Sequence, residues 1–91
     1  MLFILGEKRE VKIKITSTKN EPFTIRNAQF ELIKRGKGKL LDGKCKVEDK
    51  EISILIQPPE EGSYILQFSY EIANEVLKAN VPIEVNYYAK H

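Results

Sequence analysis

The chain has 91 residues, of which 42% are hydrophobic and 31% are charged, and its 15 basic and 13 acidic side chains give a formal net charge of +2. This length has room for one core, and the composition excludes a disordered chain and does not imply nucleic-acid binding. The single cysteine, Cys45, excludes an internal disulfide and, with one histidine, a structural zinc site. We therefore expect residues 1–91 to form a single domain without a metal or other cofactor.

The chain begins with five apolar residues, Met1 to Leu5, that end at Gly6. This run is too short for a signal peptide and lacks a basic beginning, and no apolar run approaches the ~20 residues that cross a bilayer. We therefore expect no signal peptide and no transmembrane segment. A short apolar run ended by a glycine favours a covered strand, with a frayed terminus as the alternative.

The segment from Glu10 to Thr16 alternates apolar and polar residues, which predicts a strand with a lysine row on its wet face. The row could bind phosphate, but lysines also block unwanted strand pairing, and we favour that interpretation. Residues 17–22 gather turn formers and predict a loop. From Phe23 to Leu32 the apolar spacing slips from two to three across Arg26 and Asn27, which predicts a strand with a bulge or corner.

Basic residues are densest from Lys34 to Lys39. One interpretation is contact with a phosphate or an acidic partner, and the other is a solvated connection whose glycines permit a turn. We favour the second, because the segment has no interleaved aromatic residues. We nevertheless keep its four charged residues as candidate partner-binding residues: Lys34, Arg35, Lys37 and Lys39.

The segment from Leu40 to Val47 predicts a weaker strand, interrupted by the turn signal Asp42-Gly43. Cys45 could be a nucleophile, but no base lies near it in the sequence, and a small buried hydrophobic side chain is the favoured interpretation. The charged segment Glu48 to Glu51 predicts a turn without the oxygen-rich spacing of a calcium loop. The apolar residues expected to point inward are Leu41, Cys45 and Val47.

Two further strands surround a rigid acidic turn. Ile52, Ile54 and Ile56 alternate with other residues until Pro58-Pro59 removes two backbone donors. After Gly62 a strictly alternating segment predicts a long strand with Tyr64, Leu66, Phe68, Tyr70 and Ile72 on its apolar face.

A hairpin tip at Ala73 to Glu75 leads into the last strand. Its Pro82 has no backbone donor, so we expect either an edge strand or a bulge there. An exposed edge invites a partner strand, and the alternative is that the proline prevents such pairing. We keep Pro82 as a candidate partner-binding residue. The residues of this strand expected to point inward are Leu77, Ala79, Val81, Ile83, Val85 and Tyr87.

No stretch of ten or more residues shows a helical period with caps. Six or seven short strands separated by turn signals predict an all-β antiparallel sandwich of two sheets without a substantial helix.

The segment Pro59 to Tyr64 resembles the turn before the penultimate strand of immunoglobulin-like domains, where a tyrosine hydroxyl ties back to the upstream backbone. The resemblance implies an immunoglobulin-like β-sandwich in which Gly62 and Tyr64 form this structural corner. The sequence departs from antibody domains, because it lacks tryptophan and has Leu66 and Phe68 where a disulfide cysteine would be expected.

Three features in order, residues 23–32, residues 62–66 and Ile83 to Val85, resemble immunoglobulin-like domains of phage structural proteins, including the N-terminal domain of baseplate upper proteins. The resemblance implies a phage or prophage protein of the virion, assembled in the bacterial cytoplasm. It also implies contacts with other virion proteins or with itself as an oligomer, in a capsid, tail or baseplate. No nucleic acid, membrane or small-molecule substrate is expected as a partner.

An alternative function is an immunoglobulin-like binding module of a bacterial cell-surface or secreted protein, against which stand Met1 and the missing signal peptide. A third hypothesis is an enzyme. Catalysis needs clustered titratable groups in a pocket, and the sequence identifies no such group of residues. We therefore expect a non-catalytic protein without catalytic, cofactor-binding or metal-binding residues.

Overall fold

The computed structural model describes residues 1–16 and 22–87. Every regular element in this part of the chain is a strand, so the all-β prediction is confirmed, whereas the predicted loop at 17–22 lies almost wholly outside the described residues. None of the described residues belongs to a helix that could span a membrane. The strands are β1 (Leu2–Ile4), β2 (Arg9–Lys14), β3 (Ile25–Lys34), β4 (Gly38–Lys44), β5 (Lys46–Glu48), β6 (Glu51–Ile56), β7 (Gly62–Ile72) and β8 (Glu75–Asn86).

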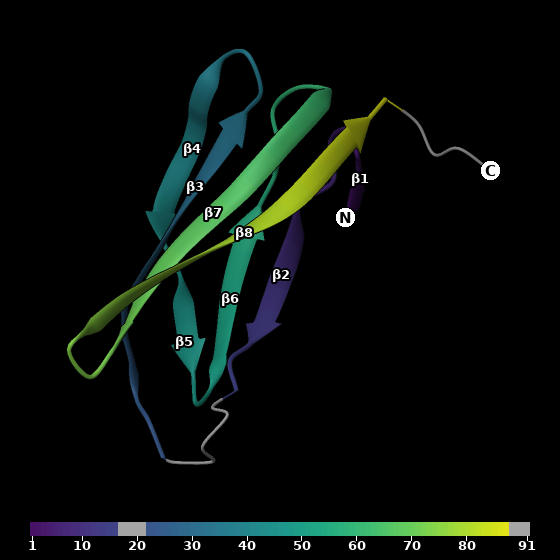
Figure 1. Cartoon of the computed structure of the whole chain (residues 1–91). Helices are drawn as coiled ribbons and strands as arrows, with labels where there is room; N and C mark the ends of the chain where they lie inside the picture. The colour runs from purple at the N-terminus through teal and green to yellow at the C-terminus, as the bar shows by residue number, and fades with distance from the viewer. Residues whose placement is uncertain (17–21, 88–91) are drawn as a thin grey trace.

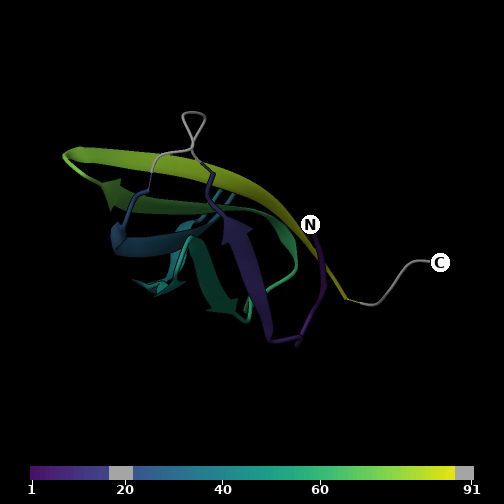
Figure 2. The same cartoon turned by 90° about the horizontal axis from the view of Figure 1, so that it is seen from below.

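The strands form two sheets that pack face to face in a sandwich-like arrangement (Figures 1 and 2). One sheet has the order β1-β8-β7-β3-β4 and the other the order β2-β6-β5. Neighbouring strands run antiparallel, except that β1 runs parallel to β8. This parallel pair corrects the expectation of antiparallel strands alone. It arises because β1 lies beside the last strand and then leads through Gly6 into β2 of the opposite sheet.

The core lies between the sheets and follows from the alternation of apolar residues. Ile52, Ile54 and Ile56 of β6 are at most 2% exposed, as are Leu66 and Phe68 of β7. Because side chains of a strand point alternately to its two faces, each apolar row covers the opposite sheet. The remaining buried residues are Phe3, Val11, Ile25, Ala28, Phe30, Leu32, Tyr64, Ile83 and Val85.

β1 is tied into the core despite its short length. The Phe3 side chain is fully buried, and the Arg9 guanidinium lies 4.7 Å from the centre of its ring. The backbone N–H of Leu5 donates to the carbonyl of Asn86 at 2.7 Å, and that of Glu84 donates to Met1 at 2.9 Å. The expectation of an ordered first strand is therefore confirmed.

The predicted irregularity near the start of β3 is a bulge. The register between β3 and β7 shifts between Arg26 and Gln29, and Asn27 has a φ of 51°. The Asn27 side-chain amide donates to the carboxylate of Glu71, which fixes the bulge to β7.

The Asp42-Gly43 turn prediction is wrong, because both residues lie inside β4. Gly43 pairs with Phe30, and a Cβ at Gly43 would lie 3.1 Å from Cε1 of the Phe30 ring, so the glycine makes room for an aromatic ring. The segment instead divides at Cys45, where the chain passes from the larger sheet into β5 of the smaller sheet. This division gives eight strands in the described residues in place of six or seven.

The apolar positions of β8 are less covered than the sequence predicts. Ile83 and Val85 are buried, but Leu77, Ala79 and Val81 are only half-buried. Tyr87 is 68% exposed, so its predicted inward orientation is wrong. The reason is that β8 ends at Asn86, so Tyr87 follows the last residue of the strand that is paired in the sheet.

Candidate functional site

The predicted corner lies at the start of β7. The Tyr64 hydroxyl donates to the backbone carbonyl of Glu60 at 2.7 Å and accepts from the backbone N–H of the same residue at 3.2 Å. Tyr64 is 1% exposed, so its hydroxyl is buried away from solvent and is satisfied by these two hydrogen bonds. Gly62 has a φ of 130°, which side-chain-bearing residues rarely adopt. Both residues therefore position the turn between β6 and β7.

The basic segment between β3 and β4 is bound to this same turn. Lys34 Nζ lies 2.6 Å from Oε2 of Glu60, and Lys37 Nζ lies 2.9 Å from its Oε1. Hydrogen bonds from the two ammonium groups lower the pKa of Glu60 to about 2, and the hydrogen bond to Glu60 raises the pKa of Lys34. The two lysines therefore join the β3–β4 turn to the β6–β7 turn through ion pairs.

The other two candidate residues of the basic segment also make contacts within the chain. Lys39 Nζ lies 2.8 Å from Oδ2 of Asp42, and this hydrogen bond raises the pKa of Lys39. The backbone N–H of Arg35 donates to the carbonyl of Ser63 at 3.0 Å. The structure thus brings Lys34 and Lys37 together at Glu60 but leaves Lys39 with a separate carboxylate.

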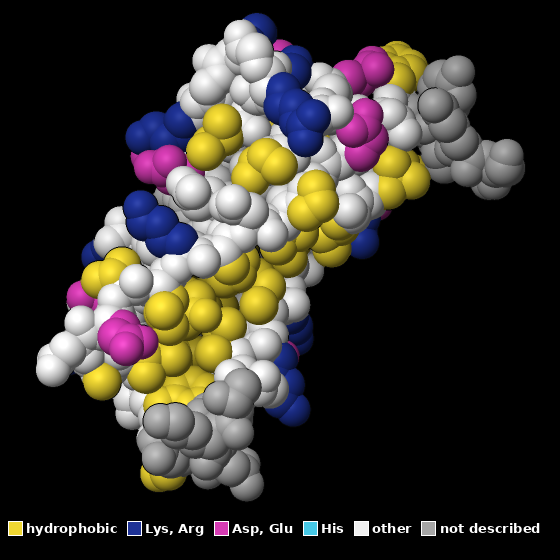
Figure 3. All heavy atoms as spheres, viewed as in Figure 1, with side chains coloured by type: hydrophobic (Ala, Val, Ile, Leu, Met, Phe, Trp, Pro, Cys, Tyr) yellow, Lys and Arg dark blue, Asp and Glu magenta, His cyan; other side chains and the backbone are white. Residues whose placement is uncertain are grey.

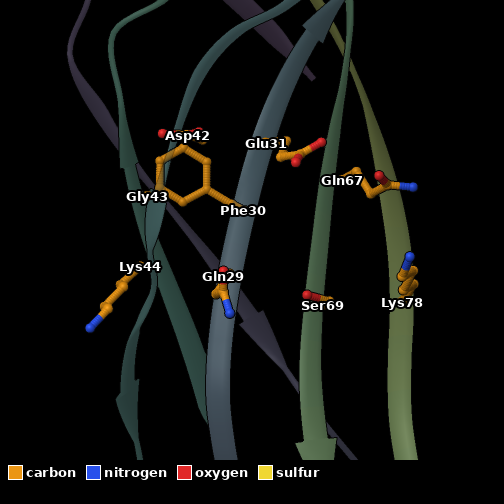
Figure 4. Close-up of a pocket in the computed structure, with 9 residues that line it drawn as sticks. All are labelled: Gln29, Phe30, Glu31, Asp42, Gly43, Lys44, Gln67, Ser69 and Lys78. Carbon is orange, nitrogen blue, oxygen red and sulfur yellow. The ribbon is translucent and has the colours of Figure 1, made fainter.

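A polar hollow of about 310 Å³ lies on the outer face of the larger sheet. Figure 4 shows its side chains rising from β4, β3, β7 and β8. The carboxylates of Glu31 and Asp42 occupy directly paired positions, while Lys44 and Lys78 stand towards the two sides. Mixed charges on an open sheet face suit hydrogen bonding to another polar surface. The lining residues are Gln29, Phe30, Glu31, Asp42, Gly43, Lys44, Gln67, Ser69 and Lys78.

Cys45 is half-buried at the passage between the sheets. Burial raises the pKa of its thiol to about 11, so the thiol is protonated at neutral pH. Because the thiolate is the nucleophilic form, this environment suits a packing role better than a reactive one.

The clearest unpaired feature in the described part of the chain is the edge of β8. β1 pairs with β8 only from Glu84 to Asn86, and no described strand pairs with the same side of residues 75–81. We call residues 75–81 the open edge. Pro82 stands at its boundary, where its carbonyl accepts a hydrogen bond of 3.0 Å from the Met1 ammonium group.

Half-buried apolar side chains lie beside the open edge. Figure 3 shows hydrophobic atoms gathered below the line that β8 follows in Figure 1. A cleft of about 970 Å³ at this end is lined in part by Phe23, Ile72 and Leu77. We call the half-buried apolar residues that line this cleft, with the next two on the same face of β8, the apolar band: Phe23, Ile72, Leu77, Ala79 and Val81.

Pro82 predicted an edge strand or a bulge, and the unpaired part of β8 lies directly before it. The apolar residues at 77, 79 and 81 were predicted to point inward, and their incomplete burial was not predicted. In comparisons with known proteins, no protein-family model matches the chain, and no curated protein matches it significantly.

Proposed function

We propose that the chain is an immunoglobulin-like, non-catalytic module that makes protein–protein contacts in a bacteriophage or prophage particle. Strand order supports the immunoglobulin-like assignment. With β2 to β8 taken as strands B, C, C′, D, E, F and G, one sheet has the order β1-G-F-C-C′ and the other B-E-D. The runs G-F-C and B-E-D are consistent with an immunoglobulin-like sandwich. The bond from Tyr64 at the start of β7 to Glu60 supports it further.

The observation that carries the contact function is the apolar band beside the open edge. Apolar surface gathered in one place on a small chain, bordered by polar residues, is typical of a surface that another protein covers. The two groups whose pKa values are shifted most support a structural role in place of catalysis. Glu60 is ionised and Cys45 is protonated at neutral pH, whereas acid–base catalysts have pKa values near the working pH.

The assignment to a phage particle is based on the resemblance of the sequence to phage structural domains, and it has a direct test. Particles released after prophage induction of the encoding strain would be purified by density gradient and analysed by quantitative mass spectrometry. We expect this chain to co-purify with the capsid and tail proteins in a fixed ratio across the gradient.

A matched control separates assembly from adsorption. Isotope-labelled recombinant chain is added to the lysate after cell lysis, and we expect it to stay outside the particle fractions while the endogenous chain is inside them. Endogenous chain that is absent from particles, or that sediments with the cell envelope, would contradict the virion proposal. The second location would instead support the alternative of a bacterial surface-binding module.

A further inference from the structure

The backbone of β8 presents hydrogen-bonding groups along the open edge. At Pro82, Glu84 and Asn86 the backbone groups face β1, because these three residues bond to Met1 and Leu5. The register between β7 and β8 continues without a shift from Gly62↔Val85 to Ile72↔Glu75. Because backbone groups point to alternate sides along a strand, those of Val76, Lys78 and Asn80 point away from β7.

The side chains of the open edge would suit the side chains of an extended segment that paired with its backbone. Leu77, Ala79 and Val81 turn towards the gap between the sheets, whereas Lys78 and Asn80 lie on the outer, polar face. An added strand would place alternate apolar side chains over the apolar band and its other side chains in line with the polar face. The added strand would lie on the same side of β8 as β1, next to the residues before those that pair with β1 at Glu84 to Asn86.

We propose that the open edge binds an extended segment of a partner protein as an additional antiparallel strand, with apolar residues on one face and an acidic residue opposite Lys78. This inference deepens the proposed function, on which it depends for the existence of a protein partner. We expect antiparallel pairing because it is slightly more stable per residue than parallel pairing.

Charge distinguishes this occupant from a second copy of the chain. Two copies that paired antiparallel over the whole of residues 75–81 would place Lys78 directly opposite Lys78. Like charges in directly opposed positions are destabilising, whereas a carboxylate there is attracted. No ion pair found among the described residues involves Lys78, so its charge is open to such a partner.

The test uses the full chain and a synthetic peptide with the pattern Val-Thr-Val-Glu-Val-Thr-Val, which has one residue for each position from 75 to 81. Hydrogen exchange would be followed by NMR. In the free protein we expect fast exchange at the amides of Val76, Lys78 and Asn80, and we expect the peptide to slow all three. Amides that are already protected in dilute free protein, or that the peptide leaves unchanged at saturating concentration, would overturn the proposal.

Two N-methylated peptides test the hydrogen bonds separately from side-chain contact. Methyl groups on the threonine and glutamate amides block the groups that would face β8, whereas methyl groups on the inner valine amides do not. We expect the first peptide to bind about tenfold more weakly or worse, and the second to bind as the parent does. Equal binding of the two would overturn strand addition.

A charge exchange tests the position opposite Lys78. Lys78→Glu should weaken the glutamate peptide by up to about fivefold and strengthen a peptide with lysine at its centre by a similar factor. Lys44→Glu is the matched control, because it makes the same change on the same outer face but on β4 at the other edge of the sheet. An equal effect of the two substitutions would contradict the proposed position of the peptide.

The outcomes separate this inference from the proposed function. Concentration-dependent protection of the three amides without peptide would identify a second copy as the occupant and overturn the inference. A chain that is found in particles but does not bind the peptide contradicts the added strand alone. A chain that binds the peptide but is absent from particles contradicts the virion assignment alone.

Discussion

Glu60 connects two turns through both its backbone and its side chain. Its backbone N–H and carbonyl bond to the Tyr64 hydroxyl, and its carboxylate bonds to Lys34 and Lys37. The side chain of Lys34 is only 18% exposed, so one of these ion pairs is sheltered from solvent. The position of the basic loop is therefore coupled to the corner at the start of β7.

Substitution of Glu60 should have an effect that depends on pH. Because the folded-state pKa of Glu60 is about 2, below its ordinary value of 4.5, its ion pairs stabilise the fold fully above that ordinary value. This stabilisation is lost as the pH falls from 4.5 towards 2. We expect Glu60→Gln to lower the free energy of unfolding at neutral pH, and the difference from the unsubstituted chain to shrink over that interval.

Urea titrations at a series of pH values would measure this difference. Glu48→Gln is the matched control, because Glu48 is an exposed carboxylate on β5 that makes none of the ion pairs found among the described residues. A deficit that stayed constant down to the lowest pH would count against the Glu60 ion pairs as its cause.

Loss of the Tyr64 hydroxyl should destabilise the fold. Tyr64→Phe leaves the backbone N–H and carbonyl of Glu60 without their partner at a part-buried position, which costs about 1 to 3 kcal/mol in the free energy of unfolding. Thermal and urea denaturation would measure it. Tyr70→Phe removes a hydroxyl from a half-buried ring on the same strand and should have a smaller effect. Similar losses for the two variants would contradict the structural role of the Tyr64 hydroxyl.

Among the elements, strands were predictable wherever apolar and polar residues alternate, as in β2, β6 and β7. The bulge at Asn27 was predictable too, because an extra residue leaves a visible slip in the spacing. The division at Cys45 was not, since a glycine that makes room for the Phe30 ring has the same local signature as a turn. Local signals report the conformation of neighbouring residues but not which distant group fills the space above a glycine.

The candidate site was also predictable from the sequence only in part. A proline at position 82 predicted an edge, but the open part of that edge precedes it, because β1 covers the residues that follow. The partners of Lys34 and Lys37 were equally hidden, since Glu60 lies 26 and 23 residues further along the chain. Contacts between distant segments depend on the arrangement of the sheets, which no local pattern contains.

Substitutions in β1 would test whether this short strand is an ordered part of the core. Phe3 is fully buried although it lies in a strand of three residues near the end of the chain. We expect Phe3→Ala to lower the free energy of unfolding by about 3 to 5 kcal/mol, as for a large aromatic ring in a core. Leu2→Ala is the control, because Leu2 lies in the same strand but is 49% exposed. Equal and small losses, measured by urea denaturation, would indicate a frayed strand.

At the scale of the whole molecule, the fold is elongated and its closing contact is remote in sequence. The principal extents are 43 × 27 × 19 Å, and the β7–β8 hairpin extends towards one end (Figure 1). That hairpin is local in sequence, whereas the β1–β8 pair joins Leu2 to Glu84. Formation of the second pair therefore closes a loop of nearly the whole chain, which has the larger entropic cost.

This topology predicts slow folding for a chain of this size. Folds dominated by pairings between distant segments refold in milliseconds to seconds, and stopped-flow refolding from urea would measure the rate. Because β1 pairs across the longest separation, we expect Phe3→Ala mainly to speed unfolding and to slow refolding little. A variant that slowed refolding as much as it destabilised the fold would show that β1 docks early.

The direction of β1 has a practical consequence for anyone who handles the protein. Because β1 runs parallel to β8 and Met1 lies beside Pro82, an affinity tag fused to the amino end would leave the fold directed along residues 75–81. Tethering gives such a tag a high effective concentration at that surface, so it would compete with any partner in solution. A tag at the carboxyl end follows β8 past Asn86, at the opposite end of the strand. Screens for binding partners should therefore carry the tag at the carboxyl end.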